Sequence, residues 1–392
     1  MIRRFRFAFS ILILIFMSSE SFCASRAEFA LERLTLEQKV GQLFIIRPEQ
    51  LNPKYKYDDT TGKSVNDKSK KKKDDFNYTV FTEEMRTFMK NYPAGGFAIF
   101  ARNIKSPEQL KRLTRELNDA SIKILGVPAI LAIDEEGGRV ARIANSKVID
   151  VEKVQNMAEI GKTKKESNAR RAGEIIGKYL KEYGFTLNFA PVVDVNTNPK
   201  NIVIGNRAFG STPSLVSRMA SAYIDGLHAY GIGACIKHFP GHGDTRGDTH
   251  KGTVNVNKTW NALKKAELIP FTENFKKSEA VMSAHVTMRK VTKDGLPASL
   301  SRAIITDKLR KELGYDGLII TDALEMSSVT KKWKPGRASL MAFEAGNDIV
   351  LLPVDYRAAY HEILNAVKKG KISEKRLNES VLRILEFKFS HM

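Results

Sequence analysis

Eight short apolar runs, separated by longer amphipathic stretches, constrain the fold of this 392-residue chain more than any other feature of its sequence. Most of the runs are bounded by Gly or Pro, and uninterrupted apolar runs of this length are typical of strands buried on both faces. The runs cover residues 41–46, 95–100, 128–134, 185–195, 233–239, 280–286, 317–324 and 348–353. We expect each of them to form one strand of a parallel sheet.

The stretches between the runs have the periodicity of helices. One opens with Ser106 as a cap, Pro107 at the first helical position and Glu108 near the positive end of the helix dipole. Alternating strands and helices define an α/β fold, and eight such units predict a single (β/α)8 TIM-like barrel. An open doubly wound sheet is the alternative, but no G-x-G-x-x-G motif follows any of the runs. Further helices are expected over residues 167–183, 213–230, 258–277, 301–313, 356–369 and 373–389.

The first 25 residues have the order of a secretory signal peptide. Arg3, Arg4 and Arg6 precede an apolar stretch over residues 7–17, which is too short for an ordinary membrane span and is followed by small and polar residues. We therefore expect a signal peptide over residues 1–25 and a barrel domain over residues 26–392 that is exported to the periplasm or the extracellular space. An uncleaved N-terminal anchor is the alternative; after cleavage we expect no stable membrane span.

The formal net charge of +20 could attract nucleic acid, anionic lipid or an acidic cell-wall polymer. An exported protein rarely meets nucleic acid, and aromatic residues are not interleaved with the basic runs, so a nucleic-acid partner is not expected. Residues 48–82 are polar, include the block Lys70–Lys73, and are expected to form a long loop insertion after the first strand. This loop could gate a site, contact an anionic polymer, or be a solvated insertion without a role.

Charged and polar residues gather where the predicted strands end. Active sites of (β/α)8 barrels lie at the carboxyl ends of the strands, so residues from several strands would converge at one mouth, which points to an enzyme. The residues in question are Asp134, Asp194, Lys237, His238, His285 and Asp322. His285 could equally be a core histidine, and Asp322 could cap a helix rather than act as a nucleophile.

The segment KHFPGHGDTRGDTH, residues 237–250, contains three of the seven histidines. His238 and His242 have the i, i+4 spacing of metal ligands on a helix, but Pro240 and the glycines disfavour a helix, so a metal site is not expected. No other cofactor is expected. Asp248 stands two residues before His250, which suits a carboxylate that orients an imidazole for acid/base catalysis. An aspartate that caps a turn beside an exposed histidine is the alternative.

The segment DEEGGRVAR, residues 134–142, combines three acids and two arginines around a Gly-Gly turn. Carboxylates suit sugar hydroxyls, whereas arginines suit carboxylates or phosphates. Glu136 and Arg139 are expected to pair with each other and hold the turn.

Four segments, IDEEGGRVAR, IGNRAFG, KHFPGHGDT with the following DTH, and IITDALEM, together resemble glycoside hydrolase family 3 in its β-N-acetylglucosaminidase (β-hexosaminidase) branch. The resemblance extends from about Leu36 to the C-terminus. It implies a TIM-like barrel and an exo-acting, retaining enzyme. Such an enzyme removes terminal non-reducing N-acetylglucosamine by double displacement through a glycosyl-enzyme, and bacterial members commonly act on peptidoglycan fragments.

The resemblance also implies roles for individual residues. Asp322 corresponds to the nucleophile and His250 to the acid/base, with Asp248 as its partner. The residues alone would have suggested a second carboxylate such as Glu325 instead, because most glycosidases use two. The positions that correspond to sugar contacts are Asp134, Arg142, Arg207, Lys237 and His238.

Three alternatives to this function remain open from the sequence. The first two are another β-glycosidase of family 3 and a phosphorylase, because a histidine acid/base could tolerate phosphate as the acceptor. The third is a non-catalytic protein that binds cell-wall glycans. In each case the expected partner is a glycan.

Overall fold

The computed structural model describes residues 19–55, 57–58, 63–64, 79–245, 252 and 254–392 of the chain. Its centre is a sheet of eight parallel strands in the order β13-β11-β9-β8-β5-β4-β1-β14, so that strands consecutive in the chain are neighbours in the sheet. A parallel bridge between Ile320 and Ile349 joins β13 to the segment that leads into β14, and this bridge closes the ring. The strands are β1 (Phe44–Ile46), β4 (Gly96–Ile99), β5 (Ile130–Ile133), β8 (Leu187–Asn188), β9 (Gly233–Phe239), β11 (Ala280–Ser283), β13 (Leu318–Thr321) and β14 (Val350–Leu351).

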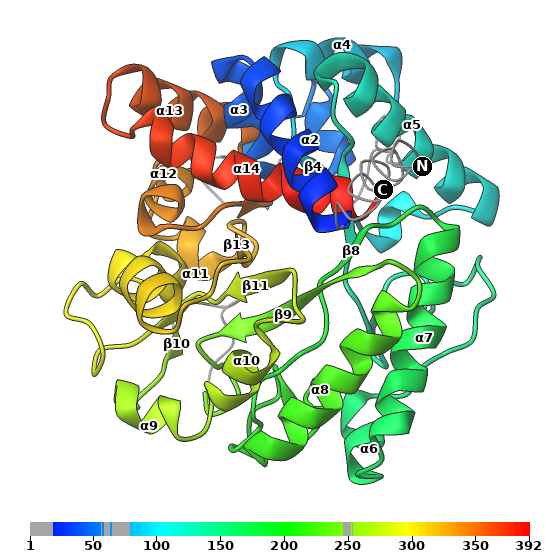
Figure 1. Ribbon diagram of the computed structural model, residues 1–392, viewed down its shortest axis with the longest axis vertical. Helices are drawn as coiled ribbons and strands as arrows, with labels where there is room; N and C mark the ends of the chain where they lie inside the picture. The colour runs from blue at the N-terminus through cyan, green and yellow to red at the C-terminus, as the bar shows by residue number, and fades with distance from the viewer. Residues whose placement is uncertain (1–18, 56, 59–62, 65–78, 246–251, 253) are drawn as a thin grey trace, which may run out of the picture.

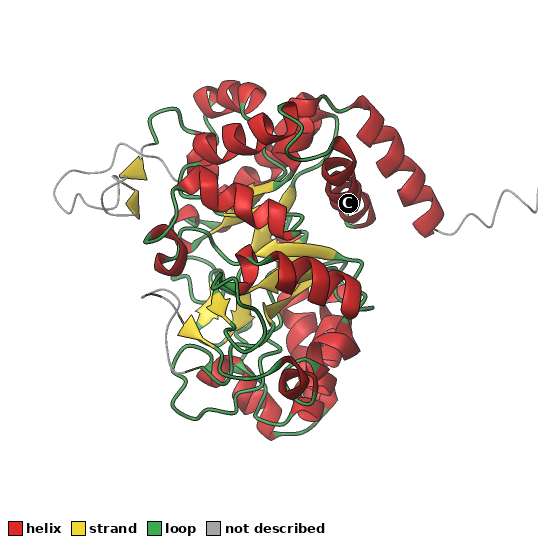
Figure 2. Cartoon of the chain, turned by 90° about the vertical axis from the view of Figure 1, so that its left-hand side faces the viewer, coloured by secondary structure: helices red, strands yellow, loops and turns green. Residues whose placement is uncertain are grey.

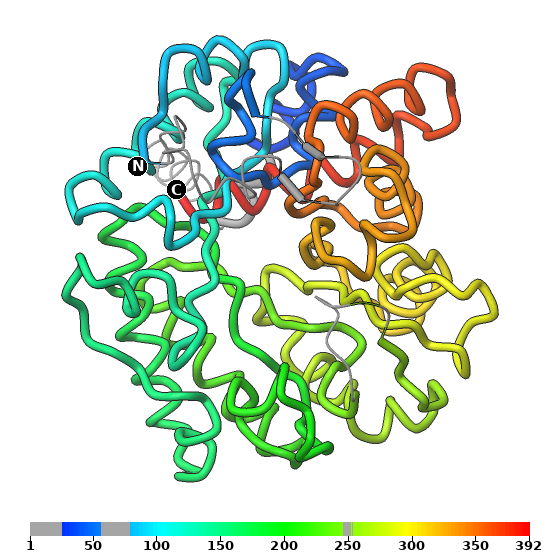
Figure 3. The backbone as a smooth tube through the Cα atoms, turned by 180° about the vertical axis from the view of Figure 1, so that it is seen from behind, coloured from blue at the N-terminus to red at the C-terminus, as the bar shows by residue number. Residues whose placement is uncertain are grey.

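Each of the eight predicted runs contains one of these strands, and the predicted (β/α)8 barrel is confirmed. Every residue of β4, β5, β9, β11 and β13 is buried, as expected for strands that have the barrel interior on one face and helices on the other. Figure 1 shows the helices arranged around this ring of strands, and Figure 3 shows the chain from behind, running around the ring from blue near the N-terminus to red near the C-terminus.

Helices cover the outside of the barrel, and Figure 2 separates them from the strands by colour. Helix α5 begins as predicted, because the side chain of Ser106 accepts a hydrogen bond from the backbone N–H of Gln109, and it ends at Gly126 with φ of 73°. The longer helices are α5 (Pro107–Leu125), α7 (Glu166–Glu182), α8 (Pro213–His228), α12 (Pro335–Ala345), α13 (Tyr356–Lys368) and α14 (Glu374–Ser390). Shorter ones are α3 (Leu36–Gln42), α4 (Glu83–Asn91), α6 (Met157–Lys162) and α11 (Ser327–Thr330).

Two predicted helices differ from the structure. The helix expected over residues 258–277 is divided into α9 (Trp260–Lys264) and α10 (Ile269–Asn274). Pro270 lies in the first turn of α10, where it can start a helix but could not have continued one from α9. The helix expected over residues 301–313 is present as a π-helical segment, η6 (Ala303–Glu312).

The start of the predicted polar loop at 48–82 is not solvated. Residues 48–51 form a short 3₁₀ turn, η1 (Pro48–Leu51), in which all four residues are buried. Glu49 accepts a hydrogen bond from Asn103 Nδ2 at 3.2 Å and forms an ion pair with Arg102, also at 3.2 Å. These contacts satisfy polar groups that water would otherwise have to solvate. The lysine block at 70–73 lies outside the described residues.

Helix α2 (Ser19–Arg33) continues across the predicted signal-cleavage position at residue 25 and packs along α14. Arg26 contributes to this contact, since its guanidinium lies 4.6 Å from the ring centroid of Phe389. Among the helices of the described part of the chain, none combines the length and the apolar character needed to cross a membrane. The predicted signal peptide remains a prediction, because residues 1–18 lie outside the described residues.

Candidate active site

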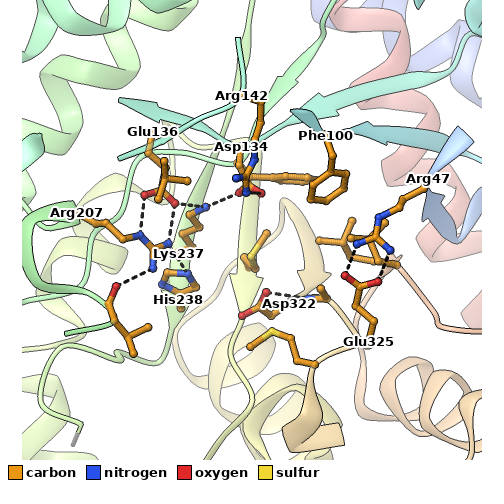
Figure 4. A pocket seen from close by; sticks show the side chains of 18 of the residues that line it. Arg47, Phe100, Asp134, Glu136, Arg142, Arg207, Lys237, His238, Asp322 and Glu325 are labelled. Carbon is orange, nitrogen blue, oxygen red and sulfur yellow. Dashed lines mark hydrogen bonds and ion pairs between the residues drawn. The ribbon is translucent and has the colours of Figure 1, made fainter. Parts of the chain in front are cut away.

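A cavity of about 480 Å³ lies at the carboxyl ends of the barrel strands. It brings together all the predicted sugar-contact residues and the predicted nucleophile, and Figure 4 shows how their side chains face one another. The predicted acid/base pair, Asp248 and His250, lies outside the described residues. The predicted residues that line the cavity are Asp134, Arg142, Arg207, Lys237, His238 and Asp322.

Four charged side chains on one wall of the cavity form a continuous network. Lys237 Nζ, at the end of β9, donates to Asp134 Oδ1 at 2.9 Å and lies 2.6 Å from Glu136 Oε1. Arg207 binds Glu136 through two parallel hydrogen bonds of 2.7 and 2.8 Å. Burial alone would raise the pKa of both carboxyl groups, but the neighbouring cations hold the pKa values of Asp134 and Glu136 below their usual range. Both groups are therefore carboxylates at neutral pH.

Arg142 completes this wall from the opposite side of Asp134. Its Nη2 lies 3.1 Å from Asp134 Oδ2, so Lys237 and Arg142 hold the two oxygens of one carboxylate. With 22% of its surface exposed, the Asp134 side chain still reaches the cavity. A carboxylate fixed in this way accepts hydrogen bonds from sugar hydroxyls without having to be reoriented.

The turn that carries these residues is held by Glu135, which was not predicted. Glu135 lies in β6 (Glu135–Gly137), which pairs with β7 (Val140–Ala141) as a small antiparallel hairpin. Its buried carboxylate accepts hydrogen bonds from the backbone N–H groups of Arg142, Ile143 and Ala144. Gly138 has a φ of 56°, and a Cβ at this position would lie 2.2 Å from Asn156 Oδ1, so glycine is required there.

The predicted pairing of Glu136 with Arg139 is wrong. Arg139 is exposed and donates to the backbone oxygens of Ile202 and Val203, at 2.9 and 2.6 Å. The two residues flank the hairpin turn, and Glu136 points into the cavity toward Arg207 (Figure 4).

His238 is oriented by a buried carboxylate behind it. Asp194 Oδ2 lies 2.7 Å from His238 Nδ1, and Arg207 Nη2 lies 3.3 Å from His238 Nε2. The other oxygen of Asp194 accepts the backbone N–H of His242 at 2.6 Å. Burial would raise the pKa of Asp194, but His238 and His242 lower it overall. His242 lines the cavity and also hydrogen-bonds Thr245 Oγ1 at 2.8 Å, so it holds the loop together.

The loop that contains Asp248 and His250 is attached at both of its described ends. On one side, Asn201 Nδ2 donates to the backbone oxygen of His242 at 2.8 Å. A Cβ on Gly243 would lie 2.0 Å from the backbone oxygen of Val195, so this glycine lets the loops after β8 and β9 pack together. On the other side, β10 (Val254–Asn255) pairs in parallel with β12 (Val286–Thr287), just beyond β11. The loop therefore leaves from the end of β9 and returns beside the end of β11.

Asp322 stands directly after β13. Its backbone N–H donates to the carbonyl of Ser283 at 2.9 Å, and its Oδ1 accepts the N–H of Ala323 at 2.8 Å. Burial would raise its pKa, but the positive fields of His285, His238 and Lys237 hold it below the usual value for aspartate. Asp322 is therefore ionised at neutral pH and lines the cavity from the side opposite the network of Asp134 and Lys237 (Figure 4).

His285 does not line the cavity. Its Nδ1 lies 2.6 Å from Ser299 Oγ, and its Nε2 lies 3.0 Å from the carbonyl of Ala323, so it supports the backbone beside Asp322. Of its two predicted roles, the buried position favours the structural one.

Arg47, Phe100 and Glu325 form a further wall that the sequence did not reveal. Arg47, which follows β1, binds Glu325 through both of its terminal nitrogens and lies 4.7 Å from the ring centroid of Phe100. Arg142 approaches the same ring at 5.5 Å. Glu325, which could have been a second catalytic carboxylate, is thus engaged by an arginine. The one available signal was their position, since residue 47 follows the predicted run 41–46 and residue 100 ends the predicted run 95–100.

Among the described residues, no group of three or more His, Cys, Asp or Glu side chains has the arrangement of a metal site. The histidine pair His238 and His242 is instead organised by Asp194, with ring centroids 6.1 Å apart.

A parallel eight-stranded barrel with a charged cavity at the carboxyl ends of its strands defines the class of (β/α)8 enzymes. The family model described as "Glycosyl hydrolase family 3 N terminal domain" matches residues 35–387. The chain belongs to glycosyl hydrolase family 3, as its four motifs predicted.

Named relatives agree with this assignment. The beta-hexosaminidase A of Pseudoalteromonas piscicida is 33% identical over 332 residues, covering 79% of this chain and 56% of that relative. A beta-hexosaminidase of Idiomarina loihiensis is 32% identical over 292 residues, covering 74% of this chain and 84% of the relative. The structure of a glycoside hydrolase family 3 beta-N-acetylglucosaminidase from Paenibacillus sp. str. FPU-7 matches with a TM-score of 0.80 and 36% identity, covering 91% of this chain and 63% of that one. This chain therefore spans little more than half of the first relative.

Proposed function

We propose that this protein is an exo-acting, retaining β-N-acetylglucosaminidase that removes terminal non-reducing N-acetylglucosamine. The observation that carries the proposal is the position of Asp322, an ionised carboxylate that faces the network of Asp134, Lys237 and Arg207 across one cavity. The names of the relatives, two beta-hexosaminidases and one beta-N-acetylglucosaminidase, support the same activity.

In the proposed first step, Asp322 attacks the anomeric carbon and a covalent glycosyl-enzyme forms. The bond to the leaving oxygen breaks, and His250 as imidazolium gives that oxygen its proton. In the second step His250 takes a proton from water, the water oxygen bonds to the anomeric carbon, and Asp322 is released. Asp248 would orient His250 and stabilise its charged form.

The attachment of the loop supports this role for His250. Its two described ends lie beside the carboxyl ends of β9 and β11, and β13, which carries Asp322, is the next strand after β11. The positions matching a sugar-binding role are Asp134, Arg142, Arg207, Lys237 and His238.

We further propose that the substrates are N-acetylglucosamine-containing peptidoglycan fragments and that the protein reaches them after export. The N-terminal sequence order of arginines, apolar run and small residues supports cleavage near residue 25. The positive formal charge would favour contact with an anionic cell-wall polymer. Mass spectrometry of the N-terminus of the exported protein tests this, and an unprocessed chain in the cytosol would contradict it.

An assay with an aryl β-N-acetylglucosaminide, with and without phosphate, tests the activity itself. We expect wild-type turnover that does not require phosphate and releases free N-acetylglucosamine. We expect Asp322→Asn to lower kcat by at least about 10³-fold, because the nucleophile is removed. A matched control is Asp316→Asn, which removes an exposed carboxylate just before the same strand and should leave kcat unchanged.

Three results would overturn parts of the proposal. Formation of N-acetylglucosamine 1-phosphate would identify a phosphorylase. Binding of N-acetylglucosamine without any turnover by the wild type would identify a glycan-binding protein. Loss of activity on chelation would show that a metal takes part.

A further inference from the structure

A second cavity, of about 460 Å³, lies at the opposite end of the barrel from the candidate active site. Pro128 and Ala129, which precede β5, and Phe185 and Thr186, which precede β8, form part of its wall, so it opens at the amino ends of the strands. Helix α14 closes it from outside with Lys388, and the C-terminal end of this helix lies beside α5 (Figure 1).

The charged side chains around this cavity are unbalanced. Lys111, Arg115, Lys181 and Lys388 line it, whereas Glu182 is the single acidic side chain among the described lining residues. Glu182 is already paired with Lys111 at 2.7 Å. Within the part of the chain that the structure describes, Arg115, Lys181 and Lys388 have no acidic side chain at salt-bridge distance. Three cations therefore surround the cavity without neutralising partners.

Lys388 is the unusual member of this group. Its side chain is 3% exposed, and its ammonium donates to Gln42 Oε1 at 2.5 Å. Buried lysines are normally paired with a carboxylate, because an amide compensates little of the cost of removing a charge from water. Burial accordingly lowers the pKa of Lys388 to about 7.

Part of the remaining wall of the cavity is apolar. Ala129, Leu131 and Phe185 are buried residues that line it, next to the ring of Tyr183. A cavity with a cationic side and an apolar side suits a molecule with an anionic head and a compact apolar body.

We propose that this cavity is a binding site for a small organic anion, whose carboxylate or phosphate group is held by Lys388, Arg115 and Lys181. The anion supplies the neutralising partner that Lys388 lacks, and its apolar body packs against Leu131 and Phe185. The inference does not depend on the proposed glycosidase activity, because no residue of this cavity lines the candidate active site.

Isothermal titration with benzoate, phenyl phosphate and benzamide, in chloride buffer of constant ionic strength, tests the proposal. Saturable binding is expected for the two anions, whereas benzamide, which is neutral and of similar shape, should bind at least tenfold more weakly. Comparing benzoate with phenyl phosphate shows which head group the site prefers. Equal binding of benzamide, or no saturation by either anion up to about 10 mM, would overturn the proposal.

Matched variants locate the binding. Lys388→Met should weaken anion binding at least tenfold, and Arg115→Ala and Lys181→Ala should each weaken it several-fold. The controls, Arg112→Ala on the helix of Arg115 and Lys178→Ala on α7, the helix that also contains Lys181, remove exposed charges that do not line the cavity. Binding that survives Lys388→Met, or that the control variants reduce equally, would place the anion elsewhere and contradict the proposal. The two alanine variants keep this test decisive even if Lys388→Met folds poorly.

The pH dependence of benzoate affinity tests the role of Lys388, because the charge of benzoate itself is constant between pH 6 and 9. The charged or titratable groups that line the cavity with Lys388 are Lys111, Arg115, Lys181, Glu182, Tyr183 and His391, and Glu279 lies 3.8 Å from His391. We expect benzoate affinity to fall as the pH rises over this range, since Lys388 loses its proton and its attraction for the anion. Affinity that is independent of pH would exclude Lys388 as the anion's ligand.

Discussion

The carboxylate of Asp194 fixes the ring of His238. Asp194 Oδ2 lies 2.7 Å from His238 Nδ1 and Arg207 Nη2 lies 3.3 Å from His238 Nε2, so each ring nitrogen faces a fixed partner. Because the same carboxylate also holds the backbone of His242, Asp194 links the charged wall of Asp134, Lys237 and Arg207 to the start of the loop that contains Asp248 and His250.

Asp194→Asn should lower kcat/KM by about 100-fold, since it loosens His238 and the loop together and small displacements of positioning groups have effects of this size. The measurement is steady-state kinetics with an aryl β-N-acetylglucosaminide. Asp225→Asn, which removes a surface ion pair with Lys277, is the control and should behave as the wild type. Wild-type kinetics for Asp194→Asn would show that His238 needs no such support.

The adjacent residues Glu135 and Glu136 should give different phenotypes when each is changed to glutamine. Glu135→Gln should lower the free energy of unfolding by about 1–3 kcal/mol. The glutamine NH2 group would face at least one of the three backbone N–H groups that now donate hydrogen bonds to the carboxylate, and that N–H group would lose its acceptor. Glu136→Gln should act mainly on kcat/KM, because it weakens the hold on Arg207 and Lys237. Chemical denaturation and kinetics on both variants measure the two effects, and identical phenotypes would contradict the division of roles.

The pH profile of kcat/KM should show that Asp322 stays ionised in mildly acidic solution. Burial opposes this, but His285, His238 and Lys237 lower the pKa of Asp322, so its protonation should limit activity only below pH 3.8, the ordinary value for aspartate. Lys237→Met removes one of these positive charges and should move the acid limb to higher pH. An acid limb that stays in place in this variant would indicate that Lys237 does not act on Asp322.

Lys388→Met should stabilise the protein at neutral pH by about 1–4 kcal/mol, because it replaces a buried cation by an apolar side chain of similar length. The folded-state pKa of Lys388 is about 7, below the unfolded value of 10.5, so the unfolded chain binds the extra proton between these values. The wild type therefore loses stability as the pH falls from 10.5 to 7. The gain from Lys388→Met should be largest at pH 7 and below, and should vanish above pH 10.5. Urea denaturation at several pH values measures this, and a gain independent of pH would contradict the shifted pKa.

The sequence predicted the strands well because strands buried on both faces require uninterrupted apolar runs, and such runs are visible without knowledge of the fold. It located most of the cavity for a related reason, since Asp134, Lys237 and Asp322 each lie at or near the carboxyl end of a predicted run. It failed where the spatial partner lies far away in the chain. Glu136 was paired with its near neighbour Arg139, whereas its partner Arg207 is 71 residues away. Local spacing also gave no reason to place Arg47 beside Glu325, which lies 278 residues further on.

The bridge between Ile320 and Ile349 closes the barrel on β13, two residues before Asp322. Asp134 follows β5, which lies four strands away from β13 around the ring. If heat opened the barrel at this bridge, Asp322 would shift relative to Asp134 while the other strands stayed paired. We therefore expect the proposed activity to be lost at a lower temperature than the secondary structure.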